Sequence, residues 1–209
     1  MKKQHFQILI AALLVILASV LFMTLKSTIP AAPATRTSAS AATTAGVEGL
    51  GGSWTLIDHN GQTVSDKDLT GSFRLMFFGF TFCPDICPTE IKRLSLVLQG
   101  LGDDATRIKP LFVTIDPERD TPTVLKEYLS RFDERFIGLT GSVDQIRHME
   151  EIFKVYSAKS ADPGLTDYTM NHSALVYFIA PDNRVLHLFH SKETPEQMVG
   201  TIRRAMAQP

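Results

Sequence analysis

Short apolar runs alternate with amphipathic stretches of helical spacing along residues 47–209, and this alternation limits the chain to few architectures. Each expected strand is short, is bounded by Gly, Pro or Asp, and is rich in β-branched or aromatic side chains. The expected strands are Trp54–Asp58, Gln62–Val64, Leu75–Phe80, Leu111–Ile115, Phe136–Leu139, Ala174–Ile179 and Val185–Phe189. The third and fourth are nearly continuous apolar runs, as expected of strands that are covered on both faces.

Helical signals separate these strands. A helix is expected after Pro88, a second from Pro122, and two more behind the capping-box patterns that begin at Ser142 and Thr194. The first two strands flank Asn60-Gly61. This pair readily adopts the positive φ angles of a tight turn, so the two strands are expected to form a hairpin. The resulting order is a hairpin, then βαβαβα, then ββα, which predicts an α/β fold with a mixed sheet flanked by helices. A thioredoxin-like arrangement with an N-terminal β-hairpin is the natural candidate.

A run of 20 residues, 6–25, is apolar apart from three hydroxyl or amide side chains. As a helix it would be about 30 Å long, which matches the thickness of a bilayer. Lys2 and Lys3 precede it, so the positive-inside tendency places the N-terminus in the cytoplasm and the following chain across the membrane. We therefore expect an N-terminal transmembrane helix within an anchor of residues 1–26. A cleaved signal peptide is the alternative, because Ala39–Ala41 fits a cleavage site, but the apolar run exceeds the usual length of about 7–15 residues.

Seventeen of the 20 residues in the segment 27–46 are Ala, Ser, Thr or Pro, which leaves no apolar face to bury and predicts a flexible linker. Residues 47–209 are then long enough for one domain with a real core and too short for two. This domain carries 17 basic against 22 acidic side chains, a net charge of −5. An acidic domain without a basic run is poorly suited to neutralise phosphates, so we exclude nucleic acid as a partner.

Cys83 and Cys87 are the only cysteines, and they lie where a buried strand gives way to the start of a helix. The unpaired amide groups and the dipole of a helix N-terminus favour thiolate, which is the form that binds metals and exchanges disulfides. If the segment is helical, a spacing of four brings both side chains to one face. A purely structural disulfide would close an interval of only three residues and gain little loop-closure entropy. The pair therefore indicates an active dithiol or a metal site. The spacing alone does not distinguish disulfide exchange from the binding of zinc or copper.

A third ligand would have to come from the six histidines. His172 is the favoured candidate, because it lies just before the expected strand Ala174–Ile179, in a loop that we expect near the end of the first long strand. The other five are expected to be solvated, partly packed or badly oriented for a shared ion: His5, His59, His148, His187 and His190.

Three separated segments carry a family resemblance: Phe78–Glu90 with both cysteines, the acidic loop Asp116–Thr121, and Tyr168–Ser173 with its histidine. In this order they resemble the three motifs of the Sco/SenC family of membrane-anchored, copper-binding assembly proteins. The match is collinear over the whole exported domain. Phe82 departs from the family pattern, which commonly has His just before the first cysteine.

The resemblance implies a thioredoxin-like fold in which Cys83, Cys87 and His172 bind copper as Cu(I) or Cu(II). It also implies a copper metallochaperone, which delivers copper to, or prepares the thiols of, the binuclear copper site in subunit II of cytochrome c oxidase. The protein would then be held in the inner membrane of a bacterium by a single span, with its domain in the periplasm. The donor types agree with this implication, since thiolates suit Cu(I) and an imidazole keeps the site useful for the oxidised ion.

Two residues of the acidic loop have expected roles beside this site. Asp120 either orients His172 or approaches Cu(II), or it caps the helix that begins near Pro122, and both roles stay open. Arg119 is expected to position the acidic loop.

The competing function is a dedicated thiol-disulfide oxidoreductase, in which Cys83 and Cys87 would be the catalytic residues without obligatory metal. A general reductase is disfavoured, because the spacing is CxxxC rather than the usual CxxC and residues 168–173 contain no proline. A peroxiredoxin-like peroxidase is a third alternative, suggested by the opening hairpin.

Overall fold

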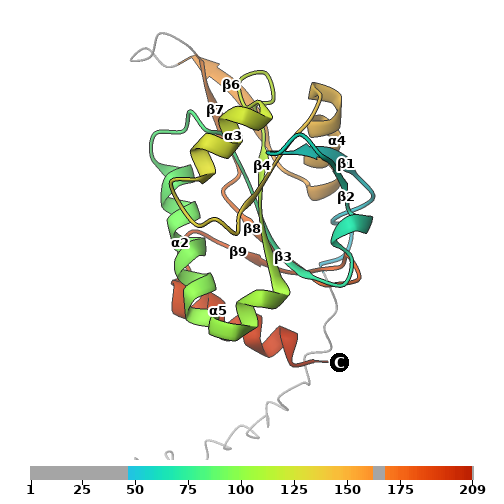
Figure 1. The fold of residues 1–209 in the computed structure, drawn as a ribbon, viewed down its shortest axis with the longest axis vertical. Helices are drawn as coiled ribbons and strands as arrows, with labels where there is room; N and C mark the ends of the chain where they lie inside the picture. Colours follow the sequence, from blue (N-terminus) through green and yellow to red (C-terminus); the bar gives the residue numbers. More distant parts are fainter. Residues whose placement is uncertain (1–46, 162–167, 209) are drawn as a thin grey trace, which may run out of the picture. The chain divides into compact units, whose positions relative to one another are not determined.

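A seven-stranded mixed sheet organises the computed structural model, which describes residues 47–161 and 168–208 (Figure 1). Its strands are β1 (Thr55–Asp58), β2 (Thr63–Ser65), β3 (Phe73–Gly79), β4 (Ile108–Thr114), β5 (Ile137–Thr140), β8 (Val176–Ile179) and β9 (Val185–Phe189). They are arranged in the order β2-β1-β5-β4-β3-β8-β9. β3, β4 and β5 run parallel to one another, whereas β1 and β2 at one edge and β8 and β9 at the other pair antiparallel.

Helices cover both faces of this sheet: α2 (Ile86–Leu101), α3 (Pro122–Leu129), α4 (Val143–Phe153) and α5 (Pro195–Met206), with two 3₁₀ helices, η1 (Lys67–Leu69) and η2 (Gly102–Arg107). α2 and α5 pack against each other on the same side as α3, and α4 covers the opposite side beside β1 (Figure 1). Thr121 caps α3, and capping boxes begin α4 at Ser142 and α5 at Thr194, as the sequence predicts for the last two.

A second, separate sheet consists of the antiparallel pair β6 (Ser157–Ala161) and β7 (Tyr168–His172), which lies at the top of the view in Figure 1. Its register pairs Ser157 with His172 and Ala161 with Tyr168. We call this pair the β6–β7 hairpin. It follows α4 and ends just before β8, so it decides where His172 lies.

The central strands explain the apolar runs of the sequence. Every residue of β3 is buried, and β4 is buried except for Lys109, because helices cover both faces of the sheet. β8 is antiparallel to β3, with Val176 paired to Phe77, so the start of β8 lies beside the end of β3. The chain just before β8 therefore arrives where β3 gives way to α2, close to the end of the first long strand as expected for His172.

The fold confirms the predicted α/β architecture, with a mixed sheet, flanking helices and an opening hairpin. Two details of the prediction are wrong. The β6–β7 hairpin was not expected, so His172 ends a strand rather than lying in a loop. α2 also begins at Ile86, two residues before Pro88, since proline is tolerated in the first turn of a helix.

The predicted anchor (1–26) and linker (27–46) lie outside the described residues. Within 47–161 and 168–208, every helix falls short of the length and apolar character that crossing a membrane takes. The extent of the domain, 47–209, stays a prediction.

Candidate metal centre

The two cysteines flank the start of α2, directly after β3. Cys87 lies in the first turn of the helix and is fully buried, whereas Cys83 lies in the turn before it and is half-buried. That turn is closed by a hydrogen bond from the Cys83 N–H to the Phe80 carbonyl, at 3.3 Å. The Cys87 N–H donates to the Cys83 sulfur at 3.4 Å, and both thiols are free. The expectation that an amide of the helix N-terminus meets a thiol is thus confirmed, although Cys83 itself precedes the helix.

Gly79, the last residue of β3, makes room for the Cys87 sulfur. A Cβ atom at this position would lie 2.9 Å from that sulfur, closer than real Cβ contacts come, and a tight 3.0 Å from the rings of Phe77 and Phe112. The thiol can therefore lie against the strand only because residue 79 has no side chain. Gly79 is not among the predicted site residues, although an isolated glycine inside an apolar strand is a known signal of close approach.

His172 reaches the cysteines from the end of β7. Its Nε2 lies 3.7 Å from the Cys87 sulfur, and its Nδ1 lies 3.0 Å from the Ser173 carbonyl. A carbonyl oxygen only accepts, so Nδ1 carries the proton and the Nε2 lone pair faces the thiol. The rings of Phe77 and Phe80 stand edge-on to the imidazole, with centroids 6.1 and 6.0 Å away. Both the tautomer and the orientation of the imidazole are thereby set, as a metal-binding histidine requires.

The two thiols differ in acidity because they share one proton. The hydrogen bond from the Cys87 thiol holds the pKa of Cys83 well below its ordinary range, against the effect of burial. The N–H groups of Cys87 and Asp85 act in the same direction as that bond. The bond with Cys83, burial and the negative charge of Cys83 all raise the pKa of Cys87. The site therefore holds one thiolate, at Cys83, and one protonated thiol.

The donor set fits a soft metal ion. Two thiols and an imidazole with a free lone pair are the ligand types that Cu(I) prefers and that Zn²⁺ also takes. Among residues 47–161 and 168–208, no three His, Cys, Asp or Glu side chains already stand close enough together to enclose a metal ion. The 3.7 Å between Cys87 and His172 is a contact distance, whereas metal bonds to nitrogen and sulfur measure about 2.0–2.3 Å for zinc. The three donor side chains are thus adjacent, but they do not surround a common metal position.

Asp120 forms hydrogen bonds with the chain segment that leads into Cys83. Its carboxylate accepts hydrogen bonds from the N–H of Thr81 at 3.0 Å, from the Thr81 hydroxyl at 2.6 Å and from the Thr114 hydroxyl at 2.7 Å. Burial raises its pKa, and these hydrogen bonds oppose that effect. The predicted alternative that Asp120 caps α3 is wrong, because Thr121 does so. Asp120 instead ties the end of β4 to the chain two residues before Cys83, and its influence on His172 stays a prediction.

The other described histidines make contacts away from the cysteines: His59 accepts from the Gly138 N–H, His148 lies against the Ser53 carbonyl, His187 faces Glu193, and the His190 N–H donates to the Glu193 carboxylate. His5 lies outside the described residues.

The sequence and the fold are similar to those of known proteins of one family. Residues 42–207 match the family model described as SCO1/SenC. The chain is 40% identical over 151 residues to the SCO2-like protein of Rickettsia felis, an alignment that covers 72% of this chain and 74% of that relative. A structure of Bradyrhizobium japonicum ScoI with copper bound shares 42% identity at a TM-score of 0.69 and covers 74% of this chain and 98% of the other. Yeast Sco1 with copper bound shares 35% identity at a TM-score of 0.70, covering 77% and 90% of the two chains.

Proposed function

The chain belongs to the SCO1/SenC family, and on this basis we propose that it is a copper metallochaperone. Its proposed task is to deliver copper to the binuclear copper site of cytochrome c oxidase subunit II, or to prepare the thiols of that site. Cys83, Cys87 and His172 are the proposed ligands. The observation that carries the proposal is the Nε2 lone pair of His172, which lies 3.7 Å from the Cys87 sulfur beside a second thiol. The two copper-bound relatives, at 42% and 35% identity, support it.

The burial of the two cysteines supports a direction for copper transfer. Cu(I) on two thiolates and a neutral imidazole carries a net charge of −1, which the amides at the start of α2 help to stabilise. Cys83 is the less buried sulfur, so an incoming thiolate from a partner reaches copper on that side. As the new copper–sulfur bond forms, the bond to Cys83 breaks, and Cys83 leaves as the thiolate that it already was when bound to copper. No electron or proton has to move in this exchange.

The proposal predicts transfer between proteins. The full chain in detergent, loaded with one equivalent of Cu(I), should pass its copper to the purified, reduced, copper-free domain of subunit II. Replacing Cys83 or Cys87 by serine should remove copper from the donor before transfer, because a hydroxyl is a poor ligand for Cu(I). The measurement is copper per protein after the two proteins are separated. A subunit II domain without its own copper-binding cysteines serves as the control and should receive none. Copper that stays on the full chain while the reduced partner is present would contradict the metallochaperone role.

We further propose that residues 6–25 anchor the domain to the inner membrane of a bacterium, with the domain in the periplasm. The apolar run and Lys2 and Lys3 before it support this proposal. Confinement to one membrane face would raise the effective concentration of a partner on the same face. After alkaline washing of membranes, the full chain should remain in the pellet, and a chain without residues 1–26 should appear in the supernatant. Recovery of the full chain in the wash would refute the anchor.

A dedicated thiol-disulfide oxidoreductase is the second candidate. It is favoured by the pairing of a half-buried thiolate at Cys83 with a buried thiol at Cys87, which is the arrangement of an attacking and a resolving cysteine. In that function the Cys83 thiolate would attack a partner disulfide, and Cys87 would then displace the partner and form the internal disulfide.

A further inference from the structure

Arg119 lies between two aromatic rings that belong to the two halves of the candidate metal centre. Its guanidinium carbon is 4.6 Å from the ring centroid of Phe82 and 3.7 Å from that of Tyr168. Phe82 directly precedes Cys83, and Tyr168 is the first residue of the strand that ends in His172. One side chain of the acidic loop therefore touches both the cysteine segment and the β6–β7 hairpin.

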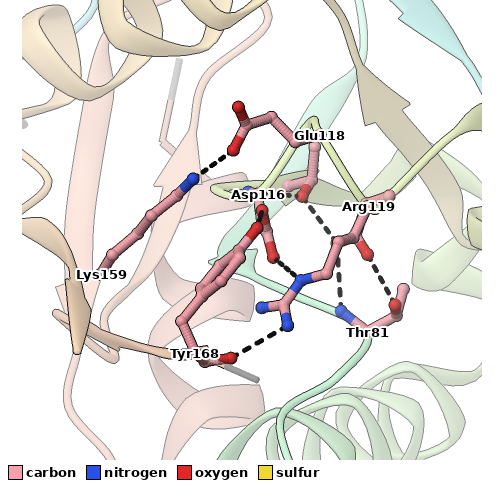
Figure 2. Close-up of polar contacts among 8 residues, drawn as sticks. Thr81, Asp116, Glu118, Arg119, Lys159 and Tyr168 are labelled. Atoms are coloured by element: carbon pink, nitrogen blue, oxygen red, sulfur yellow. Dashed lines mark hydrogen bonds and ion pairs between the residues drawn. The ribbon is translucent and has the colours of Figure 1, made fainter. Parts of the chain in front are cut away.

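Polar contacts fix the guanidinium in this position (Figure 2). Its Nε donates to the Asp116 carboxylate at 2.5 Å, and one terminal nitrogen donates to the Tyr168 carbonyl at 2.9 Å. The Tyr168 hydroxyl donates to the other Asp116 oxygen at 2.7 Å. The side chains of Arg119 and Asp116 are 13% and 1% exposed, so solvent screens these contacts little. We call Phe82, Asp116, Arg119 and Tyr168 the arginine clamp.

The strands of the β6–β7 hairpin do not pair with the seven-stranded sheet, so side-chain contacts with the acidic loop contribute to its placement. A second link, the ion pair between Lys159 of β6 and Glu118, is also visible in Figure 2. Both of its side chains are more than half exposed, and exposed ion pairs stabilise by little. The buried contacts that Arg119 and Asp116 make with Tyr168 are therefore a stronger tie between the hairpin and the acidic loop than this ion pair.

Neighbouring residues of the acidic loop hold the two halves of the site. Asp120 accepts the hydrogen bonds of Thr81, two residues before Cys83, and Arg119 holds Tyr168, four residues before His172. Any shift of one half relative to the other must therefore strain the loop or break one of these contacts.

We propose that Arg119 is a positioning residue, which keeps the β6–β7 hairpin placed so that His172 stays against Cys87. The inference rests on the proposed function for its link to copper, and on the contacts alone for its link to the hairpin. A guanidinium suits this role because it is planar, stacks on a ring at each face and forms hydrogen bonds at its edge. A lysine ammonium carries the same charge, but it has no planar face to stack on a ring and no pair of N–H groups side by side.

The test uses the full chain in detergent with Arg119→Met, which keeps an unbranched side chain and removes the guanidinium. In the reduced, metal-free protein, the backbone amides of Tyr168–His172 should exchange with solvent at least about tenfold faster, because the hairpin opens more often. The affinity for Cu(II) should fall by about ten- to hundredfold with a changed charge-transfer spectrum, the usual cost of losing a residue that orients a ligand. Arg131→Met is the matched control, since it removes only an exposed ion pair to Glu127, and it should change neither measurement.

Two further variants sharpen the test. Arg119→Lys should not restore slow exchange or the spectrum, because charge alone does not stack between two rings. Tyr168→Phe removes only the hydroxyl that binds Asp116, so it should shift both measurements in the same direction by a smaller factor. It also decides the question if Arg119→Met fails to fold.

Unchanged exchange in Tyr168–His172 and an unchanged Cu(II) spectrum in Arg119→Met would overturn the proposal, and so would full restoration by Arg119→Lys. If the unaltered chain binds no copper, the proposed function fails. Faster exchange of the hairpin in Arg119→Met would then still support the clamp, so the two failures are distinguishable.

Discussion

The His172→Ala variant should lose more than about a hundredfold in affinity for Cu(II), while its two thiols still exchange with disulfides. The structure gives one Nε2 lone pair to the site, and loss of a partner that merely orients such a ligand already costs about ten- to hundredfold. Thiol chemistry should persist because the low pKa of Cys83 depends first on the hydrogen bond from Cys87, which this variant keeps. Cu(I) should be retained better than Cu(II), since two soft thiolates remain.

The measurement pairs two titrations on the same full chain in detergent. Copper affinity is obtained against a competing chelator, and the potential of the Cys83–Cys87 pair is obtained in glutathione buffers of known ratio. His187→Ala is the matched control, because its imidazole faces Glu193 from β9. The two titrations separate the two chemistries of the site: copper binding needs the imidazole of His172, and thiol-disulfide exchange does not. Wild-type affinity for Cu(II) in His172→Ala would exclude this residue from the ligand set.

The main sheet could be predicted from the sequence because its strands bury both faces. Apolar runs such as Leu75–Phe80 have no other place in a folded domain of this size. The β6–β7 hairpin could not be predicted in this way. Its first strand, Ser157–Ala161, is small and polar with no buried residue, so no alternation of apolar side chains marks it. A strand pair that packs beside a sheet rather than within it leaves no periodic signal.

In the candidate site, only the residues whose own functional groups suggest metal binding or thiol chemistry could be predicted from the sequence. The two cysteines and His172 were named from their functional groups and their motifs, and the structure brings them together. Gly79 and the arginine clamp were not predicted, because their roles come from contacts between segments that only the folded chain brings together. The need for glycine at residue 79 comes from a sulfur eight residues later, and the Arg119 stack joins rings 86 residues apart. The sequence suggested only that Arg119 positions its loop, which the contacts of Asp116 and Tyr168 support.

Alkylation of the reduced, copper-free chain by iodoacetamide should modify Cys83 alone, at a rate that changes by less than about twofold between pH 6 and pH 8. A thiol with an ordinary pKa of about 8.5 reacts well over tenfold faster at pH 8 than at pH 6, because its thiolate fraction rises with pH. The pKa of Cys83 is lowered well below its ordinary range, so its thiolate is already fully formed at pH 6. Cys87 should stay unmodified, since it is fully buried and its pKa is raised.

The shape of the pH profile is the decisive quantity, rather than the absolute rate. A thiolate of low pKa is also a weaker nucleophile, so the gain in thiolate at pH 6 is partly cancelled. Two variants at residue 87 identify the cause, because the largest contribution is the hydrogen bond from the Cys87 thiol. Cys87→Ser keeps a donor and should keep the flat profile, whereas Cys87→Ala removes it and should move the midpoint up towards that of a free cysteine. Mass spectrometry of timed, quenched samples gives the rates. A wild-type rate that climbs close to tenfold per pH unit from 6 to 8 would mean that Cys83 is an ordinary thiol and would contradict the stabilised thiolate that favours the thiol-disulfide candidate.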